Sequence, residues 1–242
     1  MNVDVYFSPA VVDEGSVEGR TAVVIDVIRA TSCIVEALAN GARGIFPTLL
    51  PEEAVKLASS LGREETLLCG ERKGLKIEGF DLGNSPKEFS EEAVEGKQLV
   101  MSTTNGTRAL LAAEDADRVL AASFLNLSAV VQTLKGVRDL TLVCAGRENR
   151  FSMEDALCAG LLLRELAGNS GLGPDTVNDA ARAVLDIADK YVPDEEFLRS
   201  TAAGRALEGI GMDGDLAFCA ALDRHSVVPE MRERRIALVR DR

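Results

Sequence analysis

Histidine, tryptophan and tyrosine are scarce in this 242-residue chain, which has one histidine, two tyrosines and no tryptophan. Because His225 is the single histidine, a metal site built from several histidines cannot form within one chain. No apolar segment is long enough to span a membrane. The N-terminal stretch MNVDVYFSPA has neither the basic residues nor the apolar core of a signal peptide. These absences predict a cytoplasmic protein that has no membrane partner.

Cysteine is also sparse, and its pattern excludes two common roles. The five cysteines are an odd number and contain no Cys-x-x-Cys pair, which argues against a disulfide framework. Three of them lie inside apolar runs. We therefore expect small buried side chains in a reducing compartment, at Cys33, Cys69, Cys144, Cys158 and Cys219.

Positive charge is in deficit. The chain has 39 acidic and 27 basic residues, so its formal net charge is −12. Such a charge argues against nucleic acid as a partner. An anionic ligand would need local arginines or a metal ion to overcome the overall repulsion. The apolar share of 46% is enough for a sizeable core.

Short β-type runs alternate with helical patterns through the first two-thirds of the chain. This alternation predicts an α/β fold with three layers, in which helices cover both faces of a largely parallel sheet. We expect one domain over residues 1–242, with a helical C-terminal part that includes Val177–Lys190 and Glu195–Glu208. The segment DLAFCAALD fits either type, and RRIALVR reads as a last strand. The expected strands are Val3–Phe7, Ala22–Asp26, Gly44–Leu49, Thr66–Gly70, Gln98–Ser102, Arg118–Ala122 and Leu140–Ala145. The expected helices between them are Ala30–Ala39, Pro51–Leu61, Pro86–Val94, Thr107–Ala112, Leu127–Leu134 and Ser152–Leu166.

Polar side chains follow several of these strands. In an open parallel sheet the ligand site lies beyond the carboxyl ends of the strands. The run VVIDVIRATSC delivers Asp26, Arg29, Thr31 and Ser32 to that edge, and CGERKG delivers Glu71. A charge at the end of a buried strand is costly without a partner, so Asp26 marks a candidate site.

The segment STTNGTRAL joins a strand to a helix. Its hydroxyls and the first helix amides would suit a phosphate group. Ordinary helix capping by Thr104 or Asn105 is the alternative, and the two roles are compatible. The candidate substrate-binding residues here are Thr103, Thr104, Asn105, Gly106, Thr107 and Arg108.

Carboxylates at these strand ends suggest a hard cation. Asp26, Glu71 and Glu154 form a plausible set for Mg²⁺, which takes few carboxylates and several waters. Alternatively, Asp26 pairs with Arg29, and Glu154 and Asp155 are first-turn acids favoured by the helix dipole. Arg29, Arg108 and Arg147 are either surface ion-pair residues or an anion clamp.

Two further segments match known functional patterns. GIGMDG matches a dinucleotide-binding pattern, but it follows a helix and not a strand, so we reject that function. CAGRENR matches a Cys-x5-Arg pattern, with five residues between Cys144 and Arg150, as in cysteine-dependent phosphatases, although Glu148 would put a carboxylate in the phosphate cradle. The turn-rich loop GFDLGNSP either folds over the site or is a plain connection between elements. If it folds over the site, Asn84 and Ser85 are candidate substrate-binding residues.

The ordered set DVIRATS, GER, GFDLGNSP, TTNGTRAL, CAGRE, EDALCAG and DLAFCAALDRHSVVP resembles the 2-phosphosulfolactate phosphatase family over nearly the whole chain. The resemblance implies a Mg²⁺-dependent phosphatase that converts 2-phosphosulfolactate to sulfolactate and phosphate, a step of coenzyme M biosynthesis. It also implies an α/β fold distinct from the common phosphatase superfolds.

We accordingly expect Asp26, Arg29 and Glu71 to be catalytic, with Asp26 either a metal ligand or a nucleophile. The substrate would be a small anionic phosphomonoester. Two alternatives stay open: a non-catalytic binder of a phosphorylated acid, and a metal-independent phosphatase that uses Cys144. A homodimer is possible, since dimers are common among enzymes of this size.

Overall fold

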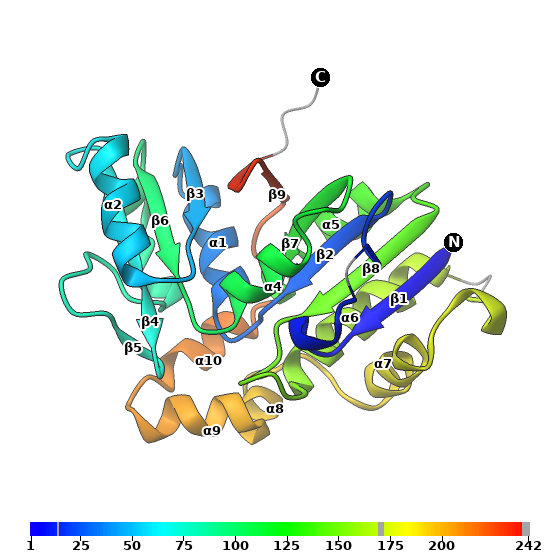
Figure 1. The fold of residues 1–242 in the computed structure, drawn as a ribbon. Coiled ribbons are helices and arrows are strands. Elements are labelled where there is room, and N and C mark those ends of the chain that lie inside the picture. The colour runs from blue at the N-terminus through cyan, green and yellow to red at the C-terminus, as the bar shows by residue number, and fades with distance from the viewer. Residues whose placement is uncertain (14, 169–171, 239–242) are drawn as a thin grey trace.

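The computed structural model describes residues 1–13, 15–168 and 172–238. Its centre is a ten-stranded mixed sheet with the strand order β1-β8-β2-β7-β9-β10-β3-β6-β4-β5 (Figure 1). The strands are β1 (Asn2–Tyr6), β2 (Thr21–Ile25), β3 (Gly44–Pro47), β4 (Thr66–Arg72), β5 (Leu75–Lys76), β6 (Gln98–Ser102), β7 (Arg118–Ala122), β8 (Asp139–Cys144), β9 (Pro229–Arg232) and β10 (Arg235–Leu238). The predicted α/β class and largely parallel sheet are confirmed.

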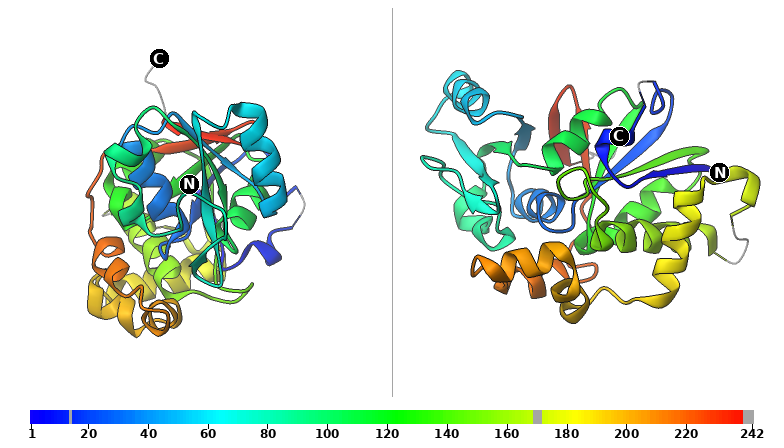
Figure 2. Two further views of the ribbon diagram at one scale, coloured as in Figure 1. Left: turned by 90° about the vertical axis from the view of Figure 1, so that its left-hand side faces the viewer. Right: turned by 60° about the horizontal axis from the view of Figure 1, so that its bottom comes forward.

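The sheet consists of two parallel blocks. In the first block, β1, β8, β2 and β7 pair in parallel, and in the second β3, β6 and β4 do so. The antiparallel hairpin β9–β10 joins them, since β9 pairs with β7 and β10 pairs with β3. It lies at the opposite end of the molecule from the C-terminal helices α8 to α10 (Figure 2).

Helices cover the faces of both blocks. They are α1 (Ala30–Ala39), α2 (Pro51–Leu61), α3 (Glu91–Val94), α4 (Gly106–Ala112), α5 (Leu127–Leu134), α6 (Met153–Ala167), α7 (Asp179–Lys190), α8 (Glu195–Ser200), α9 (Ala202–Gly209) and α10 (Gly214–Cys219). One face of the first block packs on α5, α6 and α7, and its other face packs on α1 and α4. The same α1–α4 core also contains Leu99 and Met101 of β6, whereas Val100 between them packs with α2. The alternation of side chains along a strand thus places α1 and α4 between the two blocks.

Several boundaries differ from the predictions. The helix expected over Pro86–Val94 is a 3₁₀ turn, Pro86–Glu88, followed by α3. The helix expected over Glu195–Glu208 is two helices, because the Thr201 hydroxyl accepts the Gly204 N–H (3.1 Å) and starts α9 anew. DLAFCAALD is helical only as far as Cys219, in helix α10, and RRIALVR forms β10 from Arg235 to Leu238, its last two residues lying outside the described ones. GIGMDG follows α9 and no strand, as expected.

The prediction that the cysteines are buried and unpaired is confirmed, since all five thiols are free and buried. Within the described ranges, no helix has the length and apolar character needed to cross a membrane.

Candidate active site

A pocket of about 360 Å³ lies where the carboxyl ends of strands from both blocks meet helix α9. Asp26 follows β2, Thr103 follows β6, Gly146 follows β8, and Glu71 lies near the end of β4. The arrowheads of β6 and β8 in Figure 1 point towards α9 and α10, which close this side of the molecule. The pocket is lined by Asp26, Ile28, Arg29, Glu71, Lys73, Gly74, Asn84, Thr103, Thr104, Asn105, Gly146, Arg147, Glu148, Glu154, Asp155, Ala203, Ala206, Leu207 and Ile210.

Asp26 is a buried acid that lines the pocket directly after β2. Its Oδ1 accepts the N–H of Ala30 (3.2 Å) at the start of α1. The pKa of Asp26 is raised from 3.8 to about 7, chiefly by burial and also by the nearby charges of Glu71 and Glu154, against the lowering effects of the Ala30 N–H and Arg29. The position therefore favours either a proton or a cation beside this carboxylate.

Glu154 and Asp155 open helix α6 and are both buried. Asp155 accepts the backbone N–H of Val27 (2.8 Å) and of Gly146 (3.1 Å), so it ties the loops after β2 and β8 together. Glu154 Oε2 is buried and has no hydrogen-bond partner among the described residues. Burial raises the pKa of both carboxyls above the ordinary range. Both acids lie in the first turn of α6, as the helix-dipole alternative expected, and both also line the pocket.

Glu71 braces two loops instead of facing the pocket freely. Its Oε1 accepts the Thr104 N–H (2.7 Å), and its Oε2 accepts the Gly74 N–H (2.8 Å). Both carboxylate oxygens thus already have backbone donors. Glu71 lines the pocket as predicted, but as a residue that fixes the loop after β6 against the β4–β5 turn.

Arg29 is buried against an acid that sequence patterns missed. Its Nη1 donates to Asp215 Oδ2 of α10 (2.7 Å), and its Nη2 donates to the Gly74 carbonyl (2.6 Å). Asp215 also accepts the Ser85 hydroxyl (2.6 Å). Ser85 therefore acts behind the pocket wall and not in it. Asp215 lies on the late helix α10, far from any strand end, so strand-end reasoning gave no signal for it.

The STTNGT segment uses most of its donors internally. Thr103 and Thr107 bond reciprocally, each accepting the other's backbone N–H on its hydroxyl (3.1 and 3.0 Å). Asn105 accepts the Glu148 N–H (3.1 Å). Two amides of the predicted cradle, those of Thr104 and Thr107, are therefore occupied by the protein's own acceptors, Glu71 and Thr103. The Thr104 hydroxyl is different, because it is buried, lines the pocket and has no partner among the described residues.

Gly106 is needed for close packing at this point. A Cβ there would lie 2.9 Å from Asp26 Oδ2 and would overlap Ala30 Cβ. The residue lets α4 approach α1 beside Asp26, a role that differs from the predicted contact with substrate.

Six predicted site residues are absent from the pocket lining, namely Thr31, Ser32, Ser85, Gly106, Thr107 and Arg108. The Thr31 hydroxyl bonds to the backbone of Asp26, and the Ser32 hydroxyl donates to the Val27 carbonyl (2.8 Å), so both fix the β2–α1 loop. Arg108 is exposed on α4. Since a helix turns 100° per residue, Arg108 faces away from the edge that Thr107 meets.

Cys144 is enclosed in the core between the first block and α6. Burial raises the pKa of its thiol well above the ordinary range, so the thiolate is disfavoured. Cys144 does not line the pocket. This geometry counts against the cysteine-dependent mechanism.

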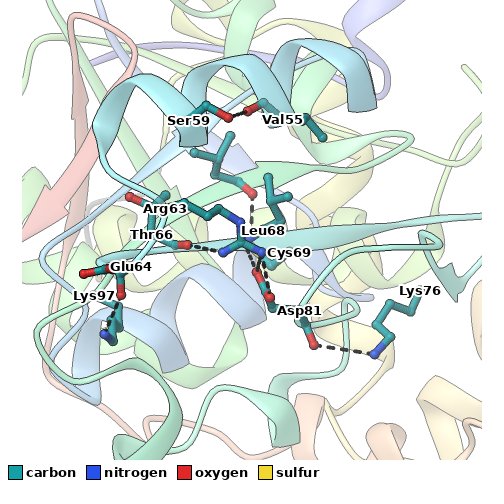
Figure 3. Close-up of polar contacts among 11 residues, drawn as sticks. Val55, Ser59, Arg63, Glu64, Thr66, Leu68, Cys69, Lys76, Asp81 and Lys97 are labelled. Atoms are coloured by element: carbon teal, nitrogen blue, oxygen red, sulfur yellow. Dashed lines mark hydrogen bonds and ion pairs between the residues drawn. The ribbon is translucent and has the colours of Figure 1, made fainter.

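The GFDLGNSP loop runs beside β4, where Leu82 bridges to Cys69. Asp81 anchors it by accepting two bonds from Arg63 Nη2 (2.8 Å each) and one from the Leu68 N–H (2.7 Å), as Figure 3 shows. The anchored loop brings Asn84 into the pocket wall, where its buried Oδ1 has no partner in the described part of the chain. The loop therefore contributes to the site, as expected.

The carboxylates provide a partial fit for a divalent cation. Among the described residues, no three histidine, cysteine, aspartate or glutamate side chains form a ready-made metal cage. The predicted trio shares one pocket, but the oxygens of Glu71 are already hydrogen-bonded. Asp26 and the unpartnered Glu154 Oε2 remain, and one or two carboxylates with several waters are what Mg²⁺ normally takes.

Lys73, Gly74 and the helix α9 wall were not expected from the sequence. Lys73 and Gly74 form the two-residue turn between β4 and β5, and both have positive φ (54° and 82°). The Lys-Gly pair is the signal for this turn, since glycine favours such a hairpin. Helix α9 contributes Ala203, Ala206 and Leu207, an apolar side opposite the acidic one.

Comparison with known proteins places this pocket in a family. The profile of the family described as 2-phosphosulpholactate phosphatase matches residues 6–234. A protein of Thermotoga petrophila named "Probable 2-phosphosulfolactate phosphatase" is 43% identical over 234 residues, which is 95% of each chain. A Clostridium perfringens protein of the same name is 40% identical over 243 residues, covering 99% of this chain and 97% of its own. The chain therefore belongs to the 2-phosphosulfolactate phosphatase family.

Proposed function

We propose that this protein is a Mg²⁺-dependent phosphatase that hydrolyses 2-phosphosulfolactate to sulfolactate and phosphate. The observation that carries the proposal is the convergence of three buried polar atoms without partners on one pocket, namely Asn84 Oδ1, Thr104 Oγ1 and Glu154 Oε2. Leaving a buried polar group unpaired costs about 1–3 kcal/mol. Three such atoms around one cavity are best explained by a polar ligand that completes their bonding.

Asp26 and Glu154 would hold the metal ion. Their burial beside other carboxylates favours a cation, and each keeps lone pairs that the protein does not use. When bound, Mg²⁺ supplies Lewis-acid polarisation of a phosphoryl oxygen and neutralises charge. Asp155 would keep the loops that carry these two ligands in place through its bonds to Val27 and Gly146.

The remaining polar groups would orient the substrate. The Thr104 hydroxyl can donate to a phosphate oxygen, and the Asn84 side chain can bond to a substrate acceptor or donor. Arg29 has three N–H groups left after its bonds to Asp215 and Gly74. Phosphoryl transfer depends chiefly on positioning and electrostatics, which these fixed groups provide.

The family and the relatives' names support the substrate. It is a small molecule with a phosphate, a carboxylate and a sulfonate, and a pocket of about 360 Å³ is in the range for small ligands. The product sulfolactate would place the reaction in coenzyme M biosynthesis. An acidic protein with one pocket lined by arginine and lysine suits such an anion better than it suits nucleic acid.

Phosphate release from 2-phosphosulfolactate, with Mg²⁺ and with EDTA, tests the proposal. Activity should require Mg²⁺, and Asp26→Asn should lower kcat about 100-fold or more, which corresponds to about 3 kcal/mol of barrier. Asp115→Asn is the matched control, because Asp115 is an exposed acid outside the pocket.

Full activity in EDTA would overturn the metal assignment. Tight binding of the substrate without any phosphate release, with or without Mg²⁺, would instead favour the non-catalytic binder. Cys144→Ser should keep most of the turnover, and a folded but inactive Cys144→Ser protein would restore the cysteine mechanism.

A further inference from the structure

The pocket has few cations for a substrate that carries three anionic groups. Three basic side chains line it, namely Arg29, Lys73 and Arg147. Five carboxylates also line it, namely Asp26, Glu71, Glu148, Glu154 and Asp155. Each substrate anion that enters must be matched by one of these cations or by a metal ion. The surroundings of the three cations differ, and the difference assigns them separate tasks.

The charge of Arg29 is already balanced. The Arg29–Asp215 pair is fully enclosed, with 2% and 5% of the two side chains exposed, and Asp215 makes no other contact with a cation in the described residues. Arg29 can thus donate hydrogen bonds to a ligand, but it adds little net charge to the pocket.

Arg147 lies at the metal-binding end. It follows β8, and its charge lowers the pKa of the neighbouring Glu154 carboxyl, against the larger effect of burial. Its Nη1 donates to the Ala202 carbonyl at the start of α9 (2.8 Å). If Asp26 and Glu154 hold the metal ion as proposed, Arg147 would serve the phosphate, whichever substituents the rest of the substrate carries.

Lys73 lines the pocket from the tip of the β4–β5 hairpin in the second block, whereas Arg147 follows β8 of the first block. The following residue, Gly74, is held on both sides, because Glu71 accepts its N–H and Arg29 donates to its carbonyl. A Cβ on Gly74 would lie 2.7 Å from Ile210 Cδ1, so the tip also packs closely against the end of α9. Across the described residues, Lys73 forms no ion pair, and its backbone takes a left-handed conformation (φ 54°) that disfavours a lysine.

We propose that Lys73 binds the sulfonate of the substrate and so determines specificity for a sulfonated phosphomonoester. The inference rests on the proposed function, whose phosphate end it leaves unchanged. An ammonium group suits a sulfonate, which is a compact anion with three equivalent oxygens. The apolar wall formed by Ala203, Ala206 and Leu207 would face the substrate between its two charged ends.

Two substrates that differ only in this group test the proposal. 2-Phospholactate has the phosphate and the carboxylate of 2-phosphosulfolactate, but a methyl group replaces the sulfonated methylene. Lys73→Met should lower the kcat/KM ratio of 2-phosphosulfolactate over 2-phospholactate about tenfold, because Lys73 is exposed and its ion pair is partly screened. Lys73→Arg should retain most of the ratio.

Two controls separate this effect from general damage. Lys76→Met changes another exposed lysine of the same hairpin, one that does not line the pocket and whose Nζ donates to the Asp81 carbonyl (3.5 Å, Figure 3), and should leave the ratio unchanged. Arg147→Met should lower kcat/KM for both substrates alike. An unchanged ratio in folded Lys73→Met would overturn the proposal.

A binding measurement gives the proposal a test that does not depend on turnover. Calorimetry with 3-sulfolactate and with lactate should show that Lys73→Met loses affinity for the sulfonated ligand alone. If the wild-type protein released no phosphate, the proposed function would fail, and this affinity difference would still decide the role of Lys73. Equal affinity of wild type and Lys73→Met for 3-sulfolactate would contradict it.

Discussion

Asp26 is a buried acid whose charge the protein barely compensates. It receives one backbone N–H and lies near two other carboxylates. In the absence of a cation, folding therefore favours its protonated form, and the folded state binds a proton more tightly than the unfolded chain does. Asp155, which directly follows Glu154 in the chain, is also buried, and its burial raises its pKa.

This residue makes the metal-free protein sensitive to alkali. The pKa of Asp26 rises from an ordinary 3.8 to about 7, so between about pH 4 and pH 7 the folded state holds more protons than the unfolded state. The free energy of unfolding should fall as pH rises through that window and then stay low. Urea unfolding in EDTA at several pH values measures it.

Asp26→Asn removes that titration and should be more stable than wild type at pH 8 but not at pH 4. The slope will be reduced and not abolished, because burial also raises the pKa of Glu154 and Asp155. The exposed Asp115→Asn should follow the wild-type curve. Parallel curves for wild type and Asp26→Asn would show that Asp26 is charged at little cost.

At the scale of elements, helices α1 and α4 meet beside the acidic group, and a glycine sets their separation. Gly106→Ala would push its methyl group into Ala30 and towards Asp26 Oδ2. Overpacking of this kind costs typically about 1–3 kcal/mol, and here it also displaces Asp26. Both the free energy of unfolding and kcat should fall.

Gly209→Ala is the matched control for that substitution. Gly209 is exposed at the end of α9, and a Cβ there would meet no heavy atom within 4 Å. Its unfolding free energy should change by about 0.5 kcal/mol or less. A Gly106→Ala protein with wild-type stability and activity would contradict the packing argument.

Most elements could be predicted because their sequence signals are local. β6 (Gln98–Ser102) and β7 (Arg118–Ala122) are short apolar runs and were placed with correct bounds. β9 could not be predicted, because its sequence PEMR starts with proline and contains one apolar residue. Its strand conformation depends on pairing with β7 and β10, which are contacts that no local pattern contains.

The site residues show the same difference between local signals and long-range contacts. Strand ends identified Asp26, Glu71, Thr104, Arg147 and Glu154, because those positions follow from a parallel sheet. The same reasoning also placed Thr31 and Ser32 at the site, but their hydroxyls donate to backbone carbonyls of the loop that precedes them. Lys73 reaches the pocket through the β4–β5 turn, and Asp215 of α10 supports Arg29 from behind it; strand ends do not indicate either position.

At the scale of the whole molecule, the hairpin β9–β10 holds the two parallel blocks together. Ile236 is fully buried in the α1–α4 core and pairs with Ile45 of β3. Ile236→Ala should lower the free energy of unfolding by about 2–5 kcal/mol, measured by urea denaturation.

Leu238→Ala, in the same strand, is the control, because Leu238 is exposed and should change that free energy by about 0.5 kcal/mol or less. Equal effects of the two substitutions would show that the hairpin contributes little to the junction.

The hairpin also has a consequence during synthesis. Every other strand of the sheet leaves the ribosome before β9 and β10 do. Until then, β7 and β3 each present an open edge, and β7 is an apolar one. Open apolar edges pair with other chains. The nascent protein is thus most prone to aggregate just before its last strands emerge, and that interval is when a chaperone would be most useful to it.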